Sequence, residues 1–189
     1  MWRFSYTGAM KQEFSPRRLD LKALARAKGK LSGESPLADF ERLKGEAQGL
    51  SENPVTWAAS GEMRPSEIGG DQVWLHLTAR TTLSLVCQRC MRPVDTLIAA
   101  DRWFRFAPDE ATAAALDDES DEDVLVLDGA FDLLSLVEDE LLMSLPLVPR
   151  HEQCPVDIKL AVADPDFVAD AAKPNPFARL ASLRVDKTG

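Results

Sequence analysis

The chain has 189 residues, of which 45% are hydrophobic, and its 31 acidic and 22 basic side chains give a formal net charge of -9. This hydrophobic content is enough for a buried core and excludes a fully disordered chain, while no apolar run reaches the roughly 18 residues of a membrane span. The odd number of cysteines and a start without a signal-peptide pattern favour a reducing compartment, so we expect a cytoplasmic protein with no membrane partner.

The acidic excess is concentrated in one internal segment. Residues 108–149 hold thirteen acidic side chains and no Lys or Arg, whereas residues 1–50 hold ten basic and six acidic side chains. A strongly acidic chain is an unusual nucleic-acid binder, because phosphates are bound by clustered positive charge. Since the excess is local, this objection does not apply to the rest of the surface.

Residues 1–50 are predicted to be a basic helical region. Ser15 followed by proline is a typical helix start and Gly29 a typical end, which predicts an amphipathic helix over Ser15–Lys30. A second, shorter helix is expected after Ser35. The charged face of the first helix is either simply solvated or binds phosphates, and it consists of Arg17, Arg18, Lys22, Arg26, Lys28 and Lys30.

Residues 51–160 are predicted to form one domain built on a sheet. Apolar and polar side chains alternate from Val55, again over Val73–Val86, and then over Val94–Phe106. Three long strands with short connections imply an antiparallel β-meander, and the pattern leaves open whether the sheet closes into a barrel. The second and third strands are joined by Cys87-Gln-Arg-Cys90, which places a Cys-x-x-Cys pair at a hairpin tip.

The acidic stretch from Pro108 to Asp123 has almost nothing to bury and is predicted to be a mobile loop. It is either a solvated linker or a surface for a partner of opposite charge. The residues that would form this surface are Asp117, Asp118, Glu119, Asp121, Glu122 and Asp123.

A leucine-rich stripe after a short strand at Val124–Leu127 predicts the strongest helix, over Phe131–Leu145. Its acidic residues, Asp132, Glu138, Asp139 and Glu140, are expected on the polar side. Packing of such helices on the meander defines an α+β fold. Residues 161–189 are expected to be a tail with a short anchoring helix.

Cys87 and Cys90, together with His151 and Cys154, form two pairs of soft metal ligands. Three thiolates and one imidazole are a typical zinc set, and two thiolates two residues apart can converge on one ion. The spacing alone gives no reason for the pairs to meet, so a metal site, free reduced thiols and a redox pair all stay open. His76, between two leucines of a strand, is interpreted as a structural histidine.

No assembled active site is recognisable in the sequence. A redox dithiol normally opens a helix, whereas both flanks of Cys87 and Cys90 have strand patterns. Nucleophile elbows, phosphate-binding glycine loops and paired catalytic carboxylates on ordered elements are missing as well. We therefore expect a protein that is not an enzyme, with a Cys-based metal or thiol redox enzyme as the alternative.

Three stretches of the chain resemble the YceD family, the large ribosomal RNA subunit accumulation proteins. They are Leu83–Pro93, which contains both cysteines of the hairpin, Glu138–His151 and Asn175–Leu180, and the resemblance extends from about Arg17 to Leu183. It implies a role in the synthesis, processing or stability of 23S ribosomal RNA, with metal and nucleic-acid binding as described family properties.

The sequence therefore predicts a ribosome biogenesis factor that binds large-subunit ribosomal RNA or its precursor, a basic ribosomal protein, or both. RNA contact is expected at the basic helix and at Arg89 and Arg92 of the hairpin tip. The acidic segment would attract a basic ribosomal protein. Zn²⁺ is the expected cofactor, with Cys87, Cys90, His151 and Cys154 as its ligands.

Overall fold

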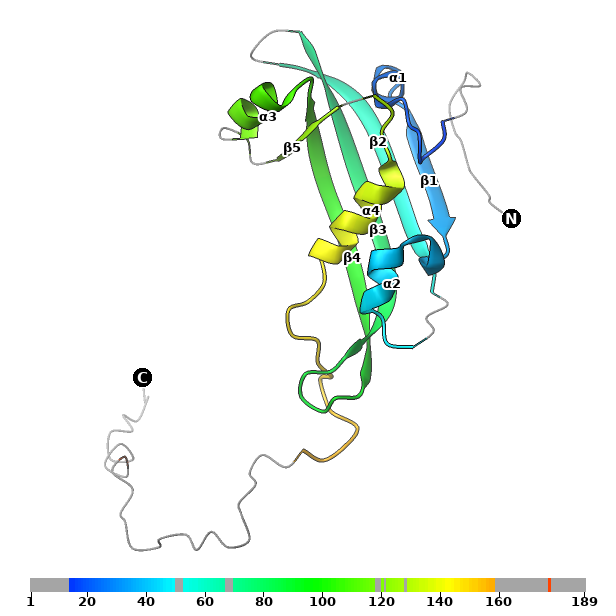
Figure 1. Ribbon diagram of the computed structural model, residues 1–189, viewed down its shortest axis with the longest axis vertical. Coiled ribbons are helices and arrows are strands. Elements are labelled where there is room, and N and C mark those ends of the chain that lie inside the picture. Colours follow the sequence, from blue (N-terminus) through cyan, green and yellow to red (C-terminus); the bar gives the residue numbers. More distant parts are fainter. Residues whose placement is uncertain are drawn as a thin grey trace, which may run out of the picture. The chain divides into compact units, whose positions relative to one another are not determined.

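The computed structural model describes residues 14–49, 53–66, 70–117, 120, 122–127, 129–158 and 177. The chain divides into two compact units, residues 1–156 and 157–189, and every helix and strand below belongs to the first. In chain order (Figure 1) they are α1 (Leu21–Arg26), β1 (Lys30–Ser35), the 3-10 turn η1 (Leu37–Asp39), α2 (Glu41–Glu46), β2 (Val55–Pro65), β3 (Asp71–Val86), β4 (Pro93–Ala107), α3 (Glu110–Asp117), β5 (Asp123–Val126) and α4 (Leu133–Met143). None of the helices in these residues has the length and apolar character needed to cross a membrane.

The five strands form one open sheet in the order β1-β2-β3-β4-β5. The three predicted strands, β2, β3 and β4, are antiparallel neighbours. The prediction of a purely helical region over residues 1–50 is wrong for Lys30–Ser35, because β1 pairs antiparallel with β2, and β5 is added parallel to β4. The longest pairing joins β3 to β4, from Val73 opposite Phe106 to Val86 opposite Pro93. The predicted hairpin tip at Cys87–Cys90 is therefore confirmed, and the sheet does not close, because β1 and β5 remain its two edges.

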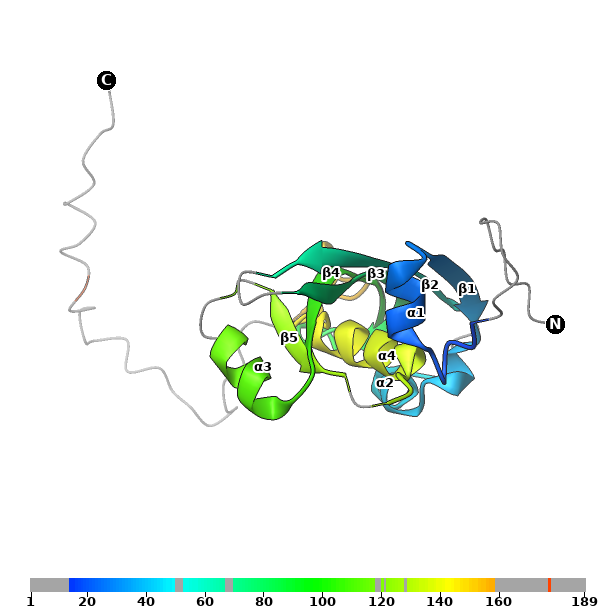
Figure 2. The same ribbon diagram turned by 90° about the horizontal axis from the view of Figure 1, so that it is seen from above.

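The helices lie on one side of the sheet, as Figure 2 shows from above. Alternate residues of the strands point to this inner face and are buried, among them Trp57, Leu75 and Phe104. The leucine stripe of α4 packs on them, which confirms the predicted α+β class with packed amphipathic helices. The other residues of the same strands form an outer face on which the structure places no helix from its described parts.

The predicted basic helix is shorter than expected, because only Leu21–Arg26 is helical. Asp20 is the N-cap, and its carboxylate accepts a hydrogen bond from the backbone N–H of Ala23. Leu19 instead exchanges two backbone hydrogen bonds with Phe131, and Lys30 already begins β1. Pairing with a distant segment thus outweighs the local helix signal at the N-terminal end, whereas the C-terminal end is closed locally, with the backbone N–H of Gly29 donating to the carbonyl of Leu24.

The prediction of a mobile loop over Pro108–Asp123 is wrong for Glu110–Asp117, which form α3. The carboxylate of Asp109 accepts a hydrogen bond from the backbone N–H of Thr112, and Ala113 and Leu116 are buried in a small cluster with Ala107. Alanine-rich sequence and a capping Asp suffice for a helix once two side chains can be buried. Asp118, Glu119 and Asp121 lie outside the described residues, as does the expected C-terminal helix except for Phe177.

The strongest predicted helix is present as α4, with Asp132 as its N-cap. Two of its acidic side chains are not on an exposed polar side as expected, because Glu138 and Glu140 are 9% and 3% exposed. The carboxylate of Glu138 accepts hydrogen bonds from the backbone N–H groups of Arg42 and Leu43 in α2.

Candidate metal centre

The turn between β3 and β4 brings the first two thiols together. The backbone N–H of Cys87 donates to the carbonyl of Arg92, and that of Met91 donates to the carbonyl of Cys87. Met91 has φ of 58°, a left-handed conformation that closes the turn. Cys87 is buried and Cys90 half-buried, so the pair sits against the end of the sheet.

The second pair reaches this turn on the segment that follows α4. The backbone N–H of Gln88 donates to the carbonyl of Pro149 over 2.8 Å, which fixes this segment beside the hairpin. The Sγ atoms of Cys87 and Cys154 are then 4.0 Å apart, and Sγ of Cys90 is 3.4 Å from Nδ1 of His151. The ligand atoms of all four residues lie within 4.8 Å of one another.

These separations suit one tetrahedral ion. A Zn–S bond of about 2.3 Å gives S···S edges of about 3.8 Å in a tetrahedron, whereas a disulfide needs about 2.05 Å. All three cysteines are free thiols. The cluster could therefore hold a metal ion, with four protein ligands and no position left for a substrate.

Arg89 is folded back onto the cluster. Its Nε donates to Sγ of Cys154 over 3.1 Å, and its Nη2 donates to the carbonyls of His151 and Glu152. The hydrogen bond to Cys154 raises the pKa of the Arg89 guanidinium. A cation at this point offsets the negative charge of thiolates, which is a different role from the RNA contact predicted for this residue.

The two hairpin thiols differ in acidity. Burial opposes ionisation of Cys87, yet hydrogen bonds from the backbone N–H groups of His151, Arg89 and Cys90 outweigh it and lower its pKa to about 5. Burial raises the pKa of Cys90, and the neighbouring Cys87 and Cys154 add to this. Without metal, the first is a thiolate and the second a thiol near pH 7, so a metal must displace a proton.

The predicted RNA-binding residues do not form one surface. Lys22, Arg26, Lys28 and Lys30 are exposed in and after α1, which lies at the upper end of the sheet in Figure 1, whereas Arg89 and Arg92 lie on the hairpin at the lower end. Arg17 is near Asp132, with 3.8 Å between Nη1 and Oδ2. Arg18 is exposed and lines a hollow beside α1 with Lys22.

A group of aromatic and cationic side chains on the outer face was not predicted from the sequence. Trp74 and Trp103 lie there on neighbouring strands, with the guanidinium of Arg64 within 4.2 Å of both ring centres. The signal was present, because Trp74 and His76 occupy the polar positions of a strand whose alternate residues are buried.

The described part of the chain thus defines an α+β protein with an open sheet and a cluster of three thiols and an imidazole at one hairpin. The chain belongs to the family described as large ribosomal RNA subunit accumulation protein YceD, which matches residues 75–184 and so includes the whole cluster. A relative from Haemophilus influenzae with the same description is 35% identical over 111 residues. This match covers 54% of the chain and 60% of the relative, and no solved structure matches the chain.

Proposed function

We propose that this protein acts in the cytoplasm to support the accumulation of large-subunit ribosomal RNA, by binding that RNA or its precursor, and that it is not an enzyme. The observation that supports this proposal is the family match over residues 75–184. The relative's name refers to large-subunit RNA accumulation, and the matched region contains most of β3, all of β4 and α4, and the four residues of the cluster.

Zn²⁺ is the ion that we propose for Cys87, Cys90, His151 and Cys154. Thiolate and imidazole are the ligands that zinc prefers, and the separations in the cluster match a tetrahedron. The ion would be structural, joining the β3–β4 hairpin to the segment after α4. Arg89 would reduce the net negative charge of three thiolates around one divalent ion.

RNA contact is proposed at the exposed cations of α1 and the start of β1, and at Arg92 of the hairpin tip. Lys22, Arg26, Lys28 and Lys30 are all exposed at one end of the sheet, so phosphates can approach them together. The acidic residues around α3 and β5 are proposed to hold a basic ribosomal protein instead. Of these, Asp117 is exposed on α3, and Asp123 pairs with Arg102.

Depletion of the protein in its host tests the proposed function. The expected result is a selective loss of large-subunit ribosomal RNA relative to small-subunit RNA, restored by expression of the wild-type chain. Quantification of both RNAs from the same cells measures the effect. Equal levels of the two RNAs after depletion would remove the proposal.

Metal content of protein purified without chelator tests the zinc site. We expect about one zinc per chain, and less than half of this in Cys154→Ser, which removes one of four ligands. Glu152→Gln is the matched control, since Glu152 lies between two ligands and contributes only its backbone carbonyl to Arg89. A metal-free wild-type chain with one reactive low-pKa thiol would instead support the redox alternative.

A further inference from the structure

The outer face of the sheet carries an ordered stack of rings and one guanidinium. The imidazole of His76 lies on the indole of Trp103, with ring centres 4.6 Å apart and planes inclined by 19°. Arg64 reaches across from β2, and its guanidinium carbon is 4.1 Å from the centre of Trp103 and 4.2 Å from that of Trp74. The two indoles meet edge to face at 6.5 Å. The stack therefore contains Trp74, Arg64, Trp103 and His76.

Polar contacts hold this stack in one arrangement. Nε2 of His76 is 2.6 Å from the carboxylate of Asp101 on β4, and Nε of Arg64 donates to Glu62. Nε of Arg105, which faces Trp74 across the strands, donates to Gln72 over 2.6 Å. Rings fixed in this way lose little conformational entropy when a ligand stacks on them.

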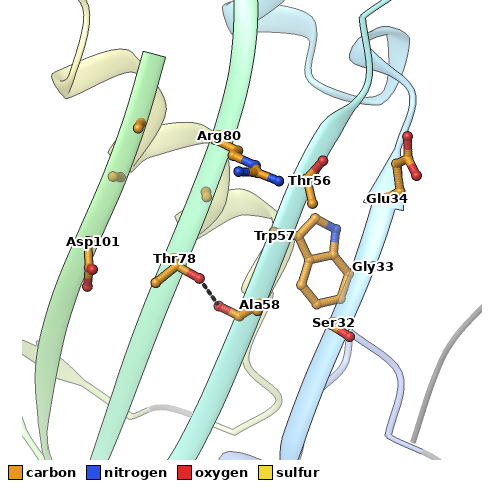
Figure 3. A pocket seen from close by; sticks show the side chains of 12 residues that line it. Ser32, Gly33, Glu34, Thr56, Trp57, Ala58, Thr78, Arg80 and Asp101 are labelled. Carbon is orange, nitrogen blue, oxygen red and sulfur yellow. Dashed lines mark hydrogen bonds between the residues drawn. The ribbon is translucent and has the colours of Figure 1, made fainter. Parts of the chain in front are cut away.

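The stack borders a hollow at its His76 end. The ring lines a cavity of about 320 Å³. Its other walls are one cation, one leucine and five small or hydroxyl-bearing residues, namely Lys30, Leu31, Ser32, Ala58, Ala59, Ser60 and Thr78. Ser32, Ala58 and Thr78 also line a larger hollow of about 600 Å³ that crosses β1 to β4. Figure 3 shows this larger hollow, in which Thr78 donates to the carbonyl of Ala58 and Arg80 extends from β3 toward Thr56, with Glu34 on β1 and Asp101 on β4.

The stack is more than core packing, although Trp74 itself is buried beside the guanidinium of Arg64. The hydrophobic core lies on the inner face, and Trp103 and His76 remain partly exposed on the other side. Open sheet faces that present rings together with cations bind single-stranded nucleic acid, because every base has a flat surface and every phosphate a charge. The exposed Lys30 also joins the hollow to the cations of α1.

We propose that the hollow beside His76 takes one unpaired base of single-stranded RNA. The base would extend the stack on the His76 ring, while the ammonium of Lys30 and the guanidinium of Arg80 lie beside the adjoining phosphates. The hydroxyls of Ser32, Ser60 and Thr78 are within the same hollow and suit contact with base edges or a 2′-hydroxyl. This inference rests on the RNA contact of the proposed function and names where a base, rather than a phosphate, is recognised.

Fluorescence anisotropy with a labelled ten-nucleotide adenosine RNA tests the site. We expect His76→Ala to weaken binding about tenfold, the effect of losing one stacking partner. His76→Phe keeps a flat ring and should recover most of this loss. Ser84→Ala is the matched control, because Ser84 lies on the same strand and the same face but outside both hollows. Thermal unfolding of each variant verifies that the sheet is intact.

An RNA of equal length whose sugars lack bases separates stacking from charge. This RNA keeps the phosphates but has no bases to stack on His76. We therefore expect it to bind the wild-type chain more weakly than the adenosine RNA does, and to bind His76→Ala and wild type equally. Unchanged affinity of His76→Ala for the adenosine RNA would overturn the proposed base site. If that variant also lost binding to protein partners, the stack would be a protein-binding surface instead. A depletion experiment with selective RNA loss would then still uphold the proposed function.

Discussion

At the scale of single residues, Glu138 connects two helices. The N-cap residue of α2, Phe40, makes no side-chain hydrogen bond to the helix. Oε1 of Glu138 on α4 takes its place and accepts from the backbone N–H groups of Arg42 and Leu43, over 2.8 Å and 3.2 Å. Oε2 accepts from Nη2 and Nε of Arg42. One carboxylate thus caps α2 and binds the first basic residue of that helix.

These contacts control the acidity of Glu138. Burial opposes its ionisation, but hydrogen bonds from the Arg42 side chain and from the backbone of Leu43 and Arg42 hold its pKa below the usual 4.5. A carboxyl whose pKa is lowered on folding stabilises the native state above its unfolded pKa, and this contribution is lost as the pH falls. Its stabilising effect is therefore complete near pH 7 and declines below about pH 4.5.

We expect Glu138→Gln to lower the free energy of unfolding by about 2 kcal/mol near pH 7, because an amide replaces a charged acceptor of several hydrogen bonds. Urea unfolding at neutral and at acidic pH measures this, and the difference from wild type should shrink on acidification. Asp139→Asn is the control, since its exposed carboxylate makes one ion pair with Arg42 and should contribute less than about 1 kcal/mol. Equal stability of Glu138→Gln and wild type near pH 7 would contradict the capping role.

At the scale of elements, α1 packs on the sheet through a glycine. A Cβ added at Gly61 on β2 would lie 3.0 Å from the backbone nitrogen of Ala25 and 3.1 Å from its Cα. Because both are main-chain atoms, the contact could be relieved only by moving the whole of α1 away from the sheet. The absent side chain of Gly61 therefore sets how closely α1 approaches β2.

Gly61→Ala should therefore destabilise the protein by about 1–3 kcal/mol, the range for inserting a methyl group into a packed contact. Gly45→Ala in α2 is the matched control, because a Cβ there meets no atom within 4 Å and alanine favours a helix by about 0.5–1 kcal/mol. Thermal unfolding should move the two variants in opposite directions. Equal melting temperatures would show that α1 adjusts freely on the sheet.

Elements with long, regular patterns were predictable, and elements made by distant contacts were not. The alternation of β2, β3 and β4 and the stripe of α4 extend over ten or more residues each, so local sequence determines them. In contrast, α1 begins only after Leu19, which pairs with the distant Phe131, and α3 forms because β5 returns to cover Ala113 and Leu116. Both outcomes depend on partners that the local pattern does not contain.

The same distinction applies to the cluster at the hairpin. Cys87 and Cys90 lie on a predictable turn, since two strands of matching pattern flank them. Their meeting with His151 and Cys154 depends on the path of the segment after α4, fixed by the bond between Gln88 and Pro149. Ligand types were therefore predictable from the sequence, and their convergence was not.

At the scale of the molecule, the fold separates surfaces of different chemistry. The helices cover the inner face, while Trp103, His76 and the hollows beside them stay partly exposed on the outer face. The hairpin cluster and α1 lie at opposite ends of the sheet in Figure 1. The acidic residues of α3 lie at the β5 edge, away from the β1 edge with Lys30 and the hollow. The two partners proposed above, RNA and a basic protein, would thus meet different edges of one sheet and would not compete.

The acidic residues around α3 and β5, called the acidic edge here, are better tested by charge substitution than by deletion of the segment. Removing residues 109–123 would also remove Ala113 and Leu116 from their buried cluster and so disturb β4 and β5. A variant with Asp117→Asn, Asp118→Asn, Glu119→Gln and Asp121→Asn keeps the pair between Arg102 and Asp123 and the length of the chain.

We expect this variant to bind a purified basic large-subunit ribosomal protein about tenfold more weakly at low salt, and to lose most of the salt dependence shown by wild type. The reason is that attraction between exposed opposite charges acts over about 10 Å in dilute salt and is screened as the salt concentration rises. Asp95→Asn combined with Glu46→Gln is the control, since Asp95 is exposed on β4 near the β3–β4 hairpin and Glu46 is exposed at the end of α2, both far from α3 in Figure 1. Titration at several salt concentrations measures the affinities, and an unchanged salt dependence in the four-residue variant would show that the acidic edge does not hold the partner.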